Sequence, residues 1–317
     1  MAHKIIIDTD PGVDDAAALL FAHNHPDIDL LGITTIFGNA DIDQVTANAL
    51  FLKNRFGIAA PVARGAGRAL TRPNGPSPAH VHGTNGLGDI DRNGDDAGEV
   101  DPRPAHQFLT DHIRAHPGEV TLVAIGRLTN LAMALSHAPD IAAKAKGVIL
   151  MGGAFAFAGP NGNVTPAAEA NIIGDPEAAD QVFGAEWPVA AIGLDVTRKT
   201  ILTRSDFDRL AEAGPRQALL SRLSQGYLDY HGQYGVDGCY THDSSALGYL
   251  LRPDLFTTRS GPVRVACDGI AAGQTILADP AVPYPPNGWD TRPHAVVAFD
   301  VDHVALQSLV LETLMTN

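Results

Sequence analysis

The stretch Ile5-Ile6-Ile7-Asp8-Thr9-Asp10-Pro11-Gly12-Val13-Asp14-Asp15 decides the fold. Three successive isoleucines predict a short buried β-strand. Pro11-Gly12 predicts a sharp turn, because Pro fixes φ and Gly tolerates positive φ. Four carboxylates lie within these eight positions, 8 to 15, and they repel one another. Helix capping accounts for one or two of them, whereas a divalent cation with oxygen ligands offsets the repulsion of all four. The stretch therefore predicts a metal or catalytic site at a strand–turn–helix junction.

The composition of the chain restricts its partners. Lys and Arg number 22 against 36 Asp and Glu, so the formal net charge is −14, which disfavours nucleic acid or an anionic membrane surface as a partner. No apolar run reaches the ~18–20 residues of a membrane span, and no basic-then-apolar signal segment is present. Cys239 and Cys267 lie in no CxxC or Cys/His cluster, which argues against a thiolate zinc site. We expect a cytoplasmic protein.

Apolar β-branched runs alternate with helical patterns along the first two thirds of the chain. We expect strands over Lys4–Asp8, Leu30–Phe37, Val120–Ile125, Gly147–Met151 and Val189–Leu194. We expect helices over Asp15–Asn24, Asp41–Arg55, Pro104–His116, Leu128–Ser136 and Pro176–Phe183. This alternation predicts an α/β fold, with a mostly parallel central sheet flanked by helices. Ligands of such sheets bind at the carboxyl ends of the strands.

The remaining segments complete the predicted organisation. Residues Pro73–Pro102 form a polar insertion rich in Gly and Pro, which predicts a flap-like loop. Arg204–Leu251 is expected to be mainly helical, and Val263–Cys267 and Ala295–Val301 to be further strands. Because no linker-like break is found, we expect residues 1–317 to form a single domain. No glycine-rich phosphate loop follows the first strand, so a nucleotide-phosphate site is not supported.

Two later groups of polar residues are candidates for chemistry. Glu169 and Asn171 lie two apart, so on an extended segment they would point the same way, with Asn163 approaching from the preceding loop. Such a set suits hydrogen bonding to a polyol, although turns and N-caps use the same residue types. Helix capping is the favoured interpretation of Asp175. The pair His242-Asp243 offers an imidazole and a carboxylate, but a single His-Asp pair is a weak signal, and from local sequence the favoured interpretation of Asp243 is a helix N-cap.

Taken together, these motifs resemble the calcium-dependent nucleoside hydrolases, the inosine-uridine-preferring N-ribohydrolase family. Asp8-Thr9-Asp10-Pro11-Gly12-Val13-Asp14-Asp15-Ala16 is similar to the N-terminal signature of that family. Five further blocks follow in the family's order: Phe37-Gly38-Asn39, Ile125-Gly126-Arg127-Leu128-Thr129-Asn130, Met151-Gly152-Gly153, the stretch from Asn163 to Asn171, and His242-Asp243. The similarity spans residues 4 to about 250. It implies an open, Rossmann-like nucleoside hydrolase fold and a homo-oligomer, a tetramer or a dimer.

The resemblance also implies a role for each matching residue. Ca²⁺ would be held by the carboxylates of Asp10, Asp15 and Asp243 and by the backbone carbonyl of Ile125. Asp10 would also be the general base toward the attacking water. His242 would lie near the nucleobase as the candidate general acid, and His82 would lie on the flap as a substrate-binding residue. The other expected substrate-binding residues are Asp14, Asn39, Asn163, Glu169, Asn171 and Asp243, with Met151 lining the sugar pocket.

The implied reaction is hydrolysis of the N-glycosidic bond of purine or pyrimidine ribonucleosides to ribose and free base. Departures from the family pattern leave the base preference open: Ala170 stands where Phe is common, Arg127 replaces the usual Pro, and Thr241 and Ser244 differ from the family's residues beside His242-Asp243. Two alternatives remain. Asp8-x-Asp10 at a strand end is also typical of Mg²⁺-dependent aspartyl phosphatases of the haloacid dehalogenase type, but Gly12 stands where those enzymes have Thr or Val. The second alternative is a nucleoside-binding protein without catalytic activity. Such a protein would not require a base such as Asp10 beside an attacking water molecule.

Overall fold

The first strand of the chain lies inside a large sheet. In the computed structural model, which describes residues 2–92, 98–157 and 159–316, β1 (His3–Thr9) pairs in parallel with β2 (Ile28–Thr35) on one side and β4 (Val120–Ala124) on the other. Ile5 and Ile7 enter one hydrophobic core and Ile6 enters a second core on the opposite face. A strand buried on both faces needs apolar residues at every position, which is why the isoleucine run predicts it.

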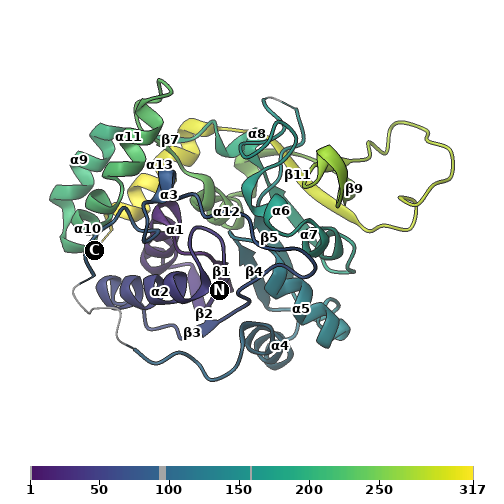
Figure 1. The fold of residues 1–317 in the computed structure, drawn as a ribbon, viewed down its shortest axis with the longest axis horizontal. Coiled ribbons are helices and arrows are strands. Elements are labelled where there is room, and N and C mark those ends of the chain that lie inside the picture. The colour runs from purple at the N-terminus through teal and green to yellow at the C-terminus, as the bar shows by residue number, and fades with distance from the viewer. Residues whose placement is uncertain (1, 93–97, 158, 317) are drawn as a thin grey trace.

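The predicted mostly parallel sheet is confirmed. In the described residues it has nine strands in the order β10-β9-β11-β6-β5-β4-β1-β2-β3 (Figure 1). Neighbours from β11 to β3 are parallel, whereas β9 is antiparallel to both β11 and β10. The remaining strands of this sheet are β3 (Val62–Arg64), β5 (Gly147–Met151), β6 (Val189–Ile192), β9 (Phe256–Val265), β10 (Thr275–Leu277) and β11 (His294–Val301).

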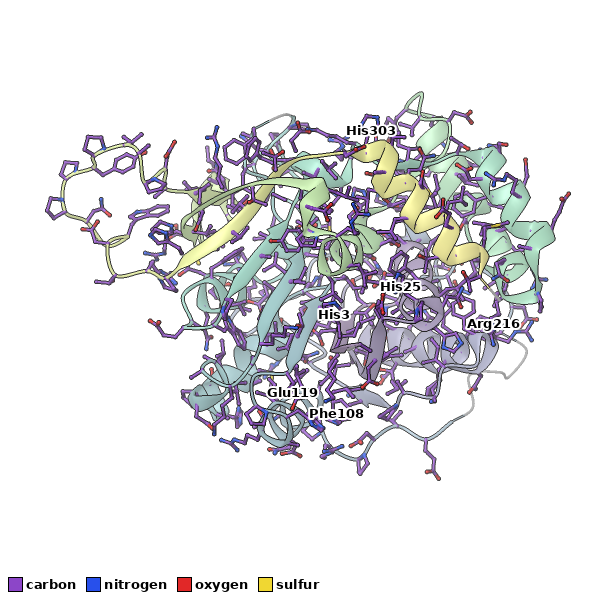
Figure 2. All side chains as sticks on the ribbon, turned by 180° about the vertical axis from the view of Figure 1, so that it is seen from behind. His3, His25, Phe108, Glu119, Arg216 and His303 are labelled. Carbon is purple, nitrogen blue, oxygen red and sulfur yellow. The ribbon has the colours of Figure 1, made fainter. Side chains whose placement is uncertain are left out.

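Helices cover both faces of the sheet (Figure 1). One core is closed by α1 (Val13–Asn24), α2 (Ile42–Phe56), α9 (Arg204–Ala213), α10 (Pro215–Leu223), α11 (Gln225–Gly232), α12 (His242–Leu251) and α13 (His303–Met315). The other core is closed by α4 (Ala105–Ala115), α5 (Thr129–His137) and α7 (Pro176–Phe183). Phe108 of α4, labelled in Figure 2, packs on Gly32 of β2, where a Cβ atom would overlap its ring.

Several short elements were not predicted from the sequence. These are β3, β10, α6 (Ala170–Gly174), α8 (Leu194–Thr197) and a separate two-stranded ribbon of β7 (Ile201–Leu202) and β8 (Cys239–Tyr240). The strand expected at Val263–Cys267 is in fact the end of the longer β9, whose first half carries exposed polar residues. Exposed polar residues in the first half of β9 give little apolar alternation, so the pattern did not show where β9 begins.

The predicted flap segment is less uniform than its composition indicated. Residues 93–97 of it lie outside the described residues. Ala79–His82 form a short helix, α3, which contacts α11, and His82 is only 7% exposed. His82 is therefore part of the protein interior and does not extend from an open loop. Among the described residues, no helix combines the length and the apolar character needed to cross a membrane.

Candidate active site

The candidate site lies where neighbouring parallel strands end. Asp10 follows β1, Asn39 follows β2, Ile125 follows β4, and Met151 is the last residue of β5. Because these strands are parallel and adjacent, their carboxyl ends meet at one edge of the sheet, which is the usual ligand-binding edge of this architecture. The sheet therefore brings together residues that lie up to 141 positions apart in the sequence.

Asn39 donates hydrogen bonds to both Asp10 and Asp15. Its backbone N–H donates to Asp10 Oδ2 at 2.8 Å, and its Nδ2 donates to the Asp10 carbonyl at 3.1 Å and to Asp15 Oδ2 at 3.0 Å. Two glycines make room for the Asp10 carboxylate, because a Cβ atom at Gly38 or Gly126 would overlap it. Asp10 is consequently held in one position by close backbone packing on both sides.

Two of the four N-terminal carboxylates also have structural partners. Asp15 accepts hydrogen bonds from the Thr9 hydroxyl and from the Gly12 N–H at the start of α1, so it does cap the helix. Asp8 accepts from the hydroxyl of Thr34 and from Asn130 Nδ2, the latter at 2.8 Å. Asn130 was not singled out from the sequence, and it also bonds the Thr35 carbonyl at 2.9 Å. Capping thus accounts for Asp15 but not for Asp10 or Asp14.

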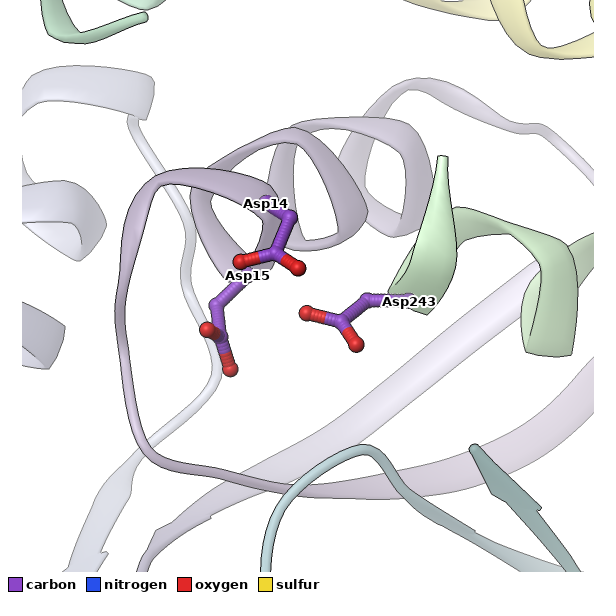
Figure 3. Close-up of side chains that lie close together, drawn as sticks. All are labelled: Asp14, Asp15 and Asp243. Carbon is purple, nitrogen blue, oxygen red and sulfur yellow. The ribbon is translucent and has the colours of Figure 1, made fainter. Parts of the chain in front are cut away.

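A cluster of three carboxylates joins the two halves of the chain. Asp14 and Asp15 of α1 and Asp243 of α12 each place one oxygen within 4.8 Å of the others, and their side chains point toward one another (Figure 3). Asp243 is 3% exposed and accepts no hydrogen bond from the described residues, and Asp14 Oδ1 is buried without a partner. Buried carboxylate oxygens that lack donors are the ligand set that a hard cation requires, so the residues present fit a metal ion.

The expected calcium ligands and the observed cluster share Asp15 and Asp243 but differ in the third carboxylate. Asp10, expected to be a metal ligand, is not one of the three clustered residues, although its charge acts on both Asp15 and Asp243. Asp14, expected to bind the sugar, is one of them. The predicted N-cap role of Asp243 is wrong: α12 begins at His242 after the N-cap Thr241, which leaves the Asp243 carboxylate free for other contacts.

Burial makes these carboxylates hard to ionise. It raises the pKa of Asp14 and of Asp15 to about 6, and for Asp15 the neighbouring Asp14 charge adds to the rise. Burial, followed by the charges of Asp14 and Asp15, raises the pKa of Asp243 well above its usual range. Burial and the Asp15 charge do the same for Asp10. A bound cation would favour the ionised form of all four groups.

Polar side chains on the β5 side of the site use some of their donor and acceptor atoms in hydrogen bonds within the protein. Asn171 Nδ2 donates to the carbonyls of Ile125 and Met151, at 3.0 Å each. The expectation that Glu169 and Asn171 lie on an extended segment is wrong, because Glu169 is the N-cap of α6 and accepts from Asn171 N at 2.9 Å and from Gly153 N at 2.9 Å. Asn163 Oδ1 accepts from Ala170 N at 3.0 Å. Asp175 caps α7, as predicted.

Histidine and tyrosine rings lie near the acidic residues of the site. His82 stacks on Tyr227 with ring centroids 5.4 Å apart, and His82 Nδ1 accepts the Val13 N–H at 3.4 Å. His242 Nδ1 lies 2.7 Å from the hydroxyl of Thr197, a partner that the sequence did not indicate. Burial lowers the pKa of His82 to about 4 and that of His242 to about 3. Both rings are therefore neutral near pH 7, and the 3.8 Å contact of His82 with Asp14 is not a charged pair.

Known proteins resemble this chain over almost its whole length. A family model described as inosine-uridine preferring nucleoside hydrolase matches residues 5–308. The probable uridine nucleosidase 2 of Arabidopsis thaliana is 40% identical and is matched over 99% of this chain and 98% of its own length. The inosine-uridine preferring nucleoside hydrolase of Leishmania major is 37% identical over 95% of both chains. A solved structure, the plant nucleoside hydrolase PpNRh1, superposes with a TM-score of 0.93 at 36% identity, covering 100% of both chains.

Proposed function

Because the chain belongs to the inosine-uridine preferring nucleoside hydrolase family, whose members cleave the N-glycosidic bond of ribonucleosides, we propose that its substrates include uridine and inosine. We further propose that it acts with Ca²⁺ and with Asp10 as the general base. The single observation that carries this proposal is the meeting of Asp14 and Asp15 with Asp243, because it gathers buried acidic oxygens from distant parts of the chain at the ligand-binding edge of the sheet.

The proposed ligands of calcium are the carboxylates of Asp10, Asp15 and Asp243 and the carbonyl of Ile125. The Asn171 side chain already donates to that carbonyl, and a carbonyl oxygen has a second lone pair available. When bound, the cation would acidify a water molecule and fix the sugar hydroxyls. Asp14, whose Oδ1 has no partner among the described residues, would accept a hydrogen bond from a ribose hydroxyl.

The other polar groups offer what the ribose ring requires. Asn163 uses its Oδ1 within the protein, which leaves Nδ2 available as a donor. Backbone N–H groups of Gly153, Asn171 and Ile172 hold the Glu169 carboxylate in place, and a ribose hydroxyl would be a further donor to it. Asn39 and Asn171 likewise donate within the protein and keep their side-chain oxygens as acceptors. We propose that these four residues bind ribose hydroxyls.

Charge development explains why so many carboxylates are useful. As the N-glycosidic bond breaks, the ribose ring becomes positive and the departing base becomes negative. Buried carboxylates that are already in place stabilise the positive ring without reorganisation, and Asp10 takes the proton of the attacking water. His242, held at Nδ1 by Thr197 and neutral near pH 7, would donate a hydrogen bond to the base through its other ring nitrogen.

A direct assay tests the proposed reaction. Purified enzyme given uridine or inosine at pH 7.5 with calcium is expected to release ribose and free base, and a chelator is expected to reduce that release at least about 100-fold. Restored calcium should restore the rate, which distinguishes loss of the ion from denaturation. Phosphate release from a sugar phosphate would instead support the phosphatase alternative, and tight nucleoside binding without turnover would support a binding protein.

Calcium affinity is expected to depend on pH. The raised pKa values of Asp14 and Asp15, about 6, mean that the folded protein without metal holds protons that the unfolded chain has already released. The contribution of these two groups to folding stability therefore falls as pH rises from about 4 to about 6. Calcium must displace those protons, so its affinity should rise at least about tenfold between pH 5.5 and 7.5. Calorimetry in buffers of different ionisation enthalpy should show more proton release at pH 6 than at pH 8, because Asp14 and Asp15 are already ionised at pH 8; equal release at both would contradict the raised pKa values of these two groups.

A further inference from the structure

Asp195, in α8, holds the loop that follows β5. It is 4% exposed, and its two oxygens accept the backbone N–H groups of Phe155 and Phe157, at 2.7 Å each. Between these two residues, Ala156 has a φ of 61°, in the left-handed region that residues with a Cβ atom rarely adopt. Such a backbone persists only where surrounding contacts enforce it. Because the Ala156 side chain is exposed, the two hydrogen bonds to Asp195 on either side of it are the contacts that do so.

The part of this loop nearer to β5 is bound to α8 and to β10. The Gly153 carbonyl accepts the N–H of Leu194, the first residue of α8, at 2.9 Å. This approach is close because the N-cap of α8 is Gly193, where a Cβ atom would lie 2.6 Å from the Gly153 oxygen. The hydroxyl of Thr275 accepts the Ala154 N–H at 3.0 Å and donates to the Ala154 carbonyl at 2.9 Å. The loop is therefore fixed through its backbone along its whole described length.

This loop in turn holds a residue of the proposed sugar site. Glu169 accepts three backbone N–H groups, and those of Asn171 and Ile172 belong to α6, the helix that Glu169 itself caps. The third donor, the Gly153 N–H at 2.9 Å, comes from the loop after β5. The first two donors move with Glu169, so the Gly153 N–H is the contact that fixes its carboxylate relative to the sheet. Hydrogen bonds thus connect α8, the loop and Glu169.

We propose that Asp195 is a positioning residue for the sugar side of the site. It enforces the left-handed backbone of the loop after β5, which places the Gly153 N–H and, through it, the Glu169 carboxylate. Asp195 itself does not touch the substrate. The inference rests on the proposed function, because it takes Glu169 as an acceptor for a ribose hydroxyl. It requires that the effect of losing Asp195 on the reaction passes through Glu169.

A double-mutant cycle on activity tests this requirement. In Asp195→Asn the side chain keeps its size, but an amide oxygen can accept only one of the two N–H groups and an NH₂ group faces the other. At saturating calcium, kcat/KM for uridine should fall about tenfold or more, because a displaced Glu169 loses much of its hydrogen bond to the sugar. In a Glu169→Gln background the same substitution should lower kcat/KM less than about threefold. Equal losses in the two backgrounds would overturn the inference.

The matched control is Asp206→Asn. Asp206 is also buried, at 7% exposed, and its carboxylate accepts the Thr203 N–H at 2.9 Å in the capping box of α9, a helix that supplies no residue to the proposed site. Its loss should lower the melting temperature as Asp195→Asn does, but should change kcat/KM less than about twofold in both backgrounds. A purely structural role of Asp195 would give this result for Asp195→Asn as well.

A second cycle tests the hold on the loop without substrate or metal. Glycine adopts a positive φ without strain, so Ala156→Gly should relieve the loop only where Asp195 enforces its conformation. The change in melting temperature caused by Ala156→Gly should be about 1–3 °C more favourable in the wild type than in Asp195→Asn, because the entropy that glycine adds to the unfolded chain is the same in both. Equal changes would overturn the inference. If Glu169→Gln alone left kcat/KM unchanged, the proposed sugar contact would fail instead, and this cycle would still decide whether Asp195 fixes the loop.

Discussion

The Asp10→Asn variant is expected to lower kcat for uridine by about 10²–10⁴-fold, the usual contribution of a positioned general base. An amide cannot take up the proton of the attacking water. The shape of the site should survive, because the amide oxygen can still accept the Asn39 N–H that Asp10 Oδ2 now accepts at 2.8 Å. The rate of ribose release should be measured at saturating calcium, so that any weaker binding of the ion does not enter kcat.

The matched control for this variant is Asp140→Asn. Asp140 is an exposed carboxylate in ion pairs with Arg114 and Lys144, so the same chemical change there should alter kcat less than twofold, as is usual for surface substitutions. Folding of Asp10→Asn is checked by its melting temperature without metal, which should not fall, because a buried charge has been removed. A kcat within tenfold of the wild type would reject Asp10 as the base.

The strand–turn–helix unit could be predicted because its signals are local. A β-branched run, Pro-Gly and two acids at a helix start each constrain the few residues around them, and the structure has β1 and α1 where these signals place them. The fold class followed because parallel strands alternate with helices over long segments. Short elements such as β3, which is three residues long, give too few positions for a period to be detected.

The site could be predicted only in part, because its contacts join distant positions. The residues Asp15 and Asp243 lie 228 positions apart, and nothing in the local sequence around His242-Asp243 distinguishes a ligand from a cap. Resemblance to a family supplied that pairing. The burial of His82 and of Arg127 could not be deduced either, because it depends on the packing of α3 against α11 and on the space left by Gly174.

The start of α6 could not be predicted from the types of its residues. Glu169 and Asn171 were expected on an extended segment, but Glu169 accepts three backbone N–H groups at a helix start. Glutamate is a less common N-cap than Asp, Ser or Thr, so no capping signal in the sequence indicated this helix. The result is a buried carboxylate that backbone N–H groups hold in one position.

Asp243→Asn is expected to affect the metal-free and calcium-bound enzymes in opposite directions. Burial and the charges of Asp14 and Asp15 raise the pKa of Asp243 well above its usual range. In the unfolded chain Asp243 has its usual, lower pKa, so at pH 8 its carboxylate makes the folded, metal-free protein less stable relative to the unfolded chain. Asn carries no ionisable group, so the variant does not lose this stability. The metal-free variant should therefore melt about 2–6 °C higher than the wild type. It should bind calcium at least about 100-fold more weakly, because a charged ligand is lost, and ribose release should fall by a similar factor at limiting calcium.

The control for this prediction is Asp43→Asn, which also removes an acidic residue from the first turn of a helix. Asp43 lies in the first turn of α2 with its side chain 84% exposed. Its loss should slightly destabilise the protein through the helix dipole, by about 0.3–1 kcal/mol, and should leave calcium affinity unchanged. The two variants therefore differ in the sign of the stability change, although the chemical substitution is the same. If Asp243→Asn destabilised the metal-free protein as Asp43→Asn does, or if it bound calcium like the wild type, Asp243 would not belong to a metal site.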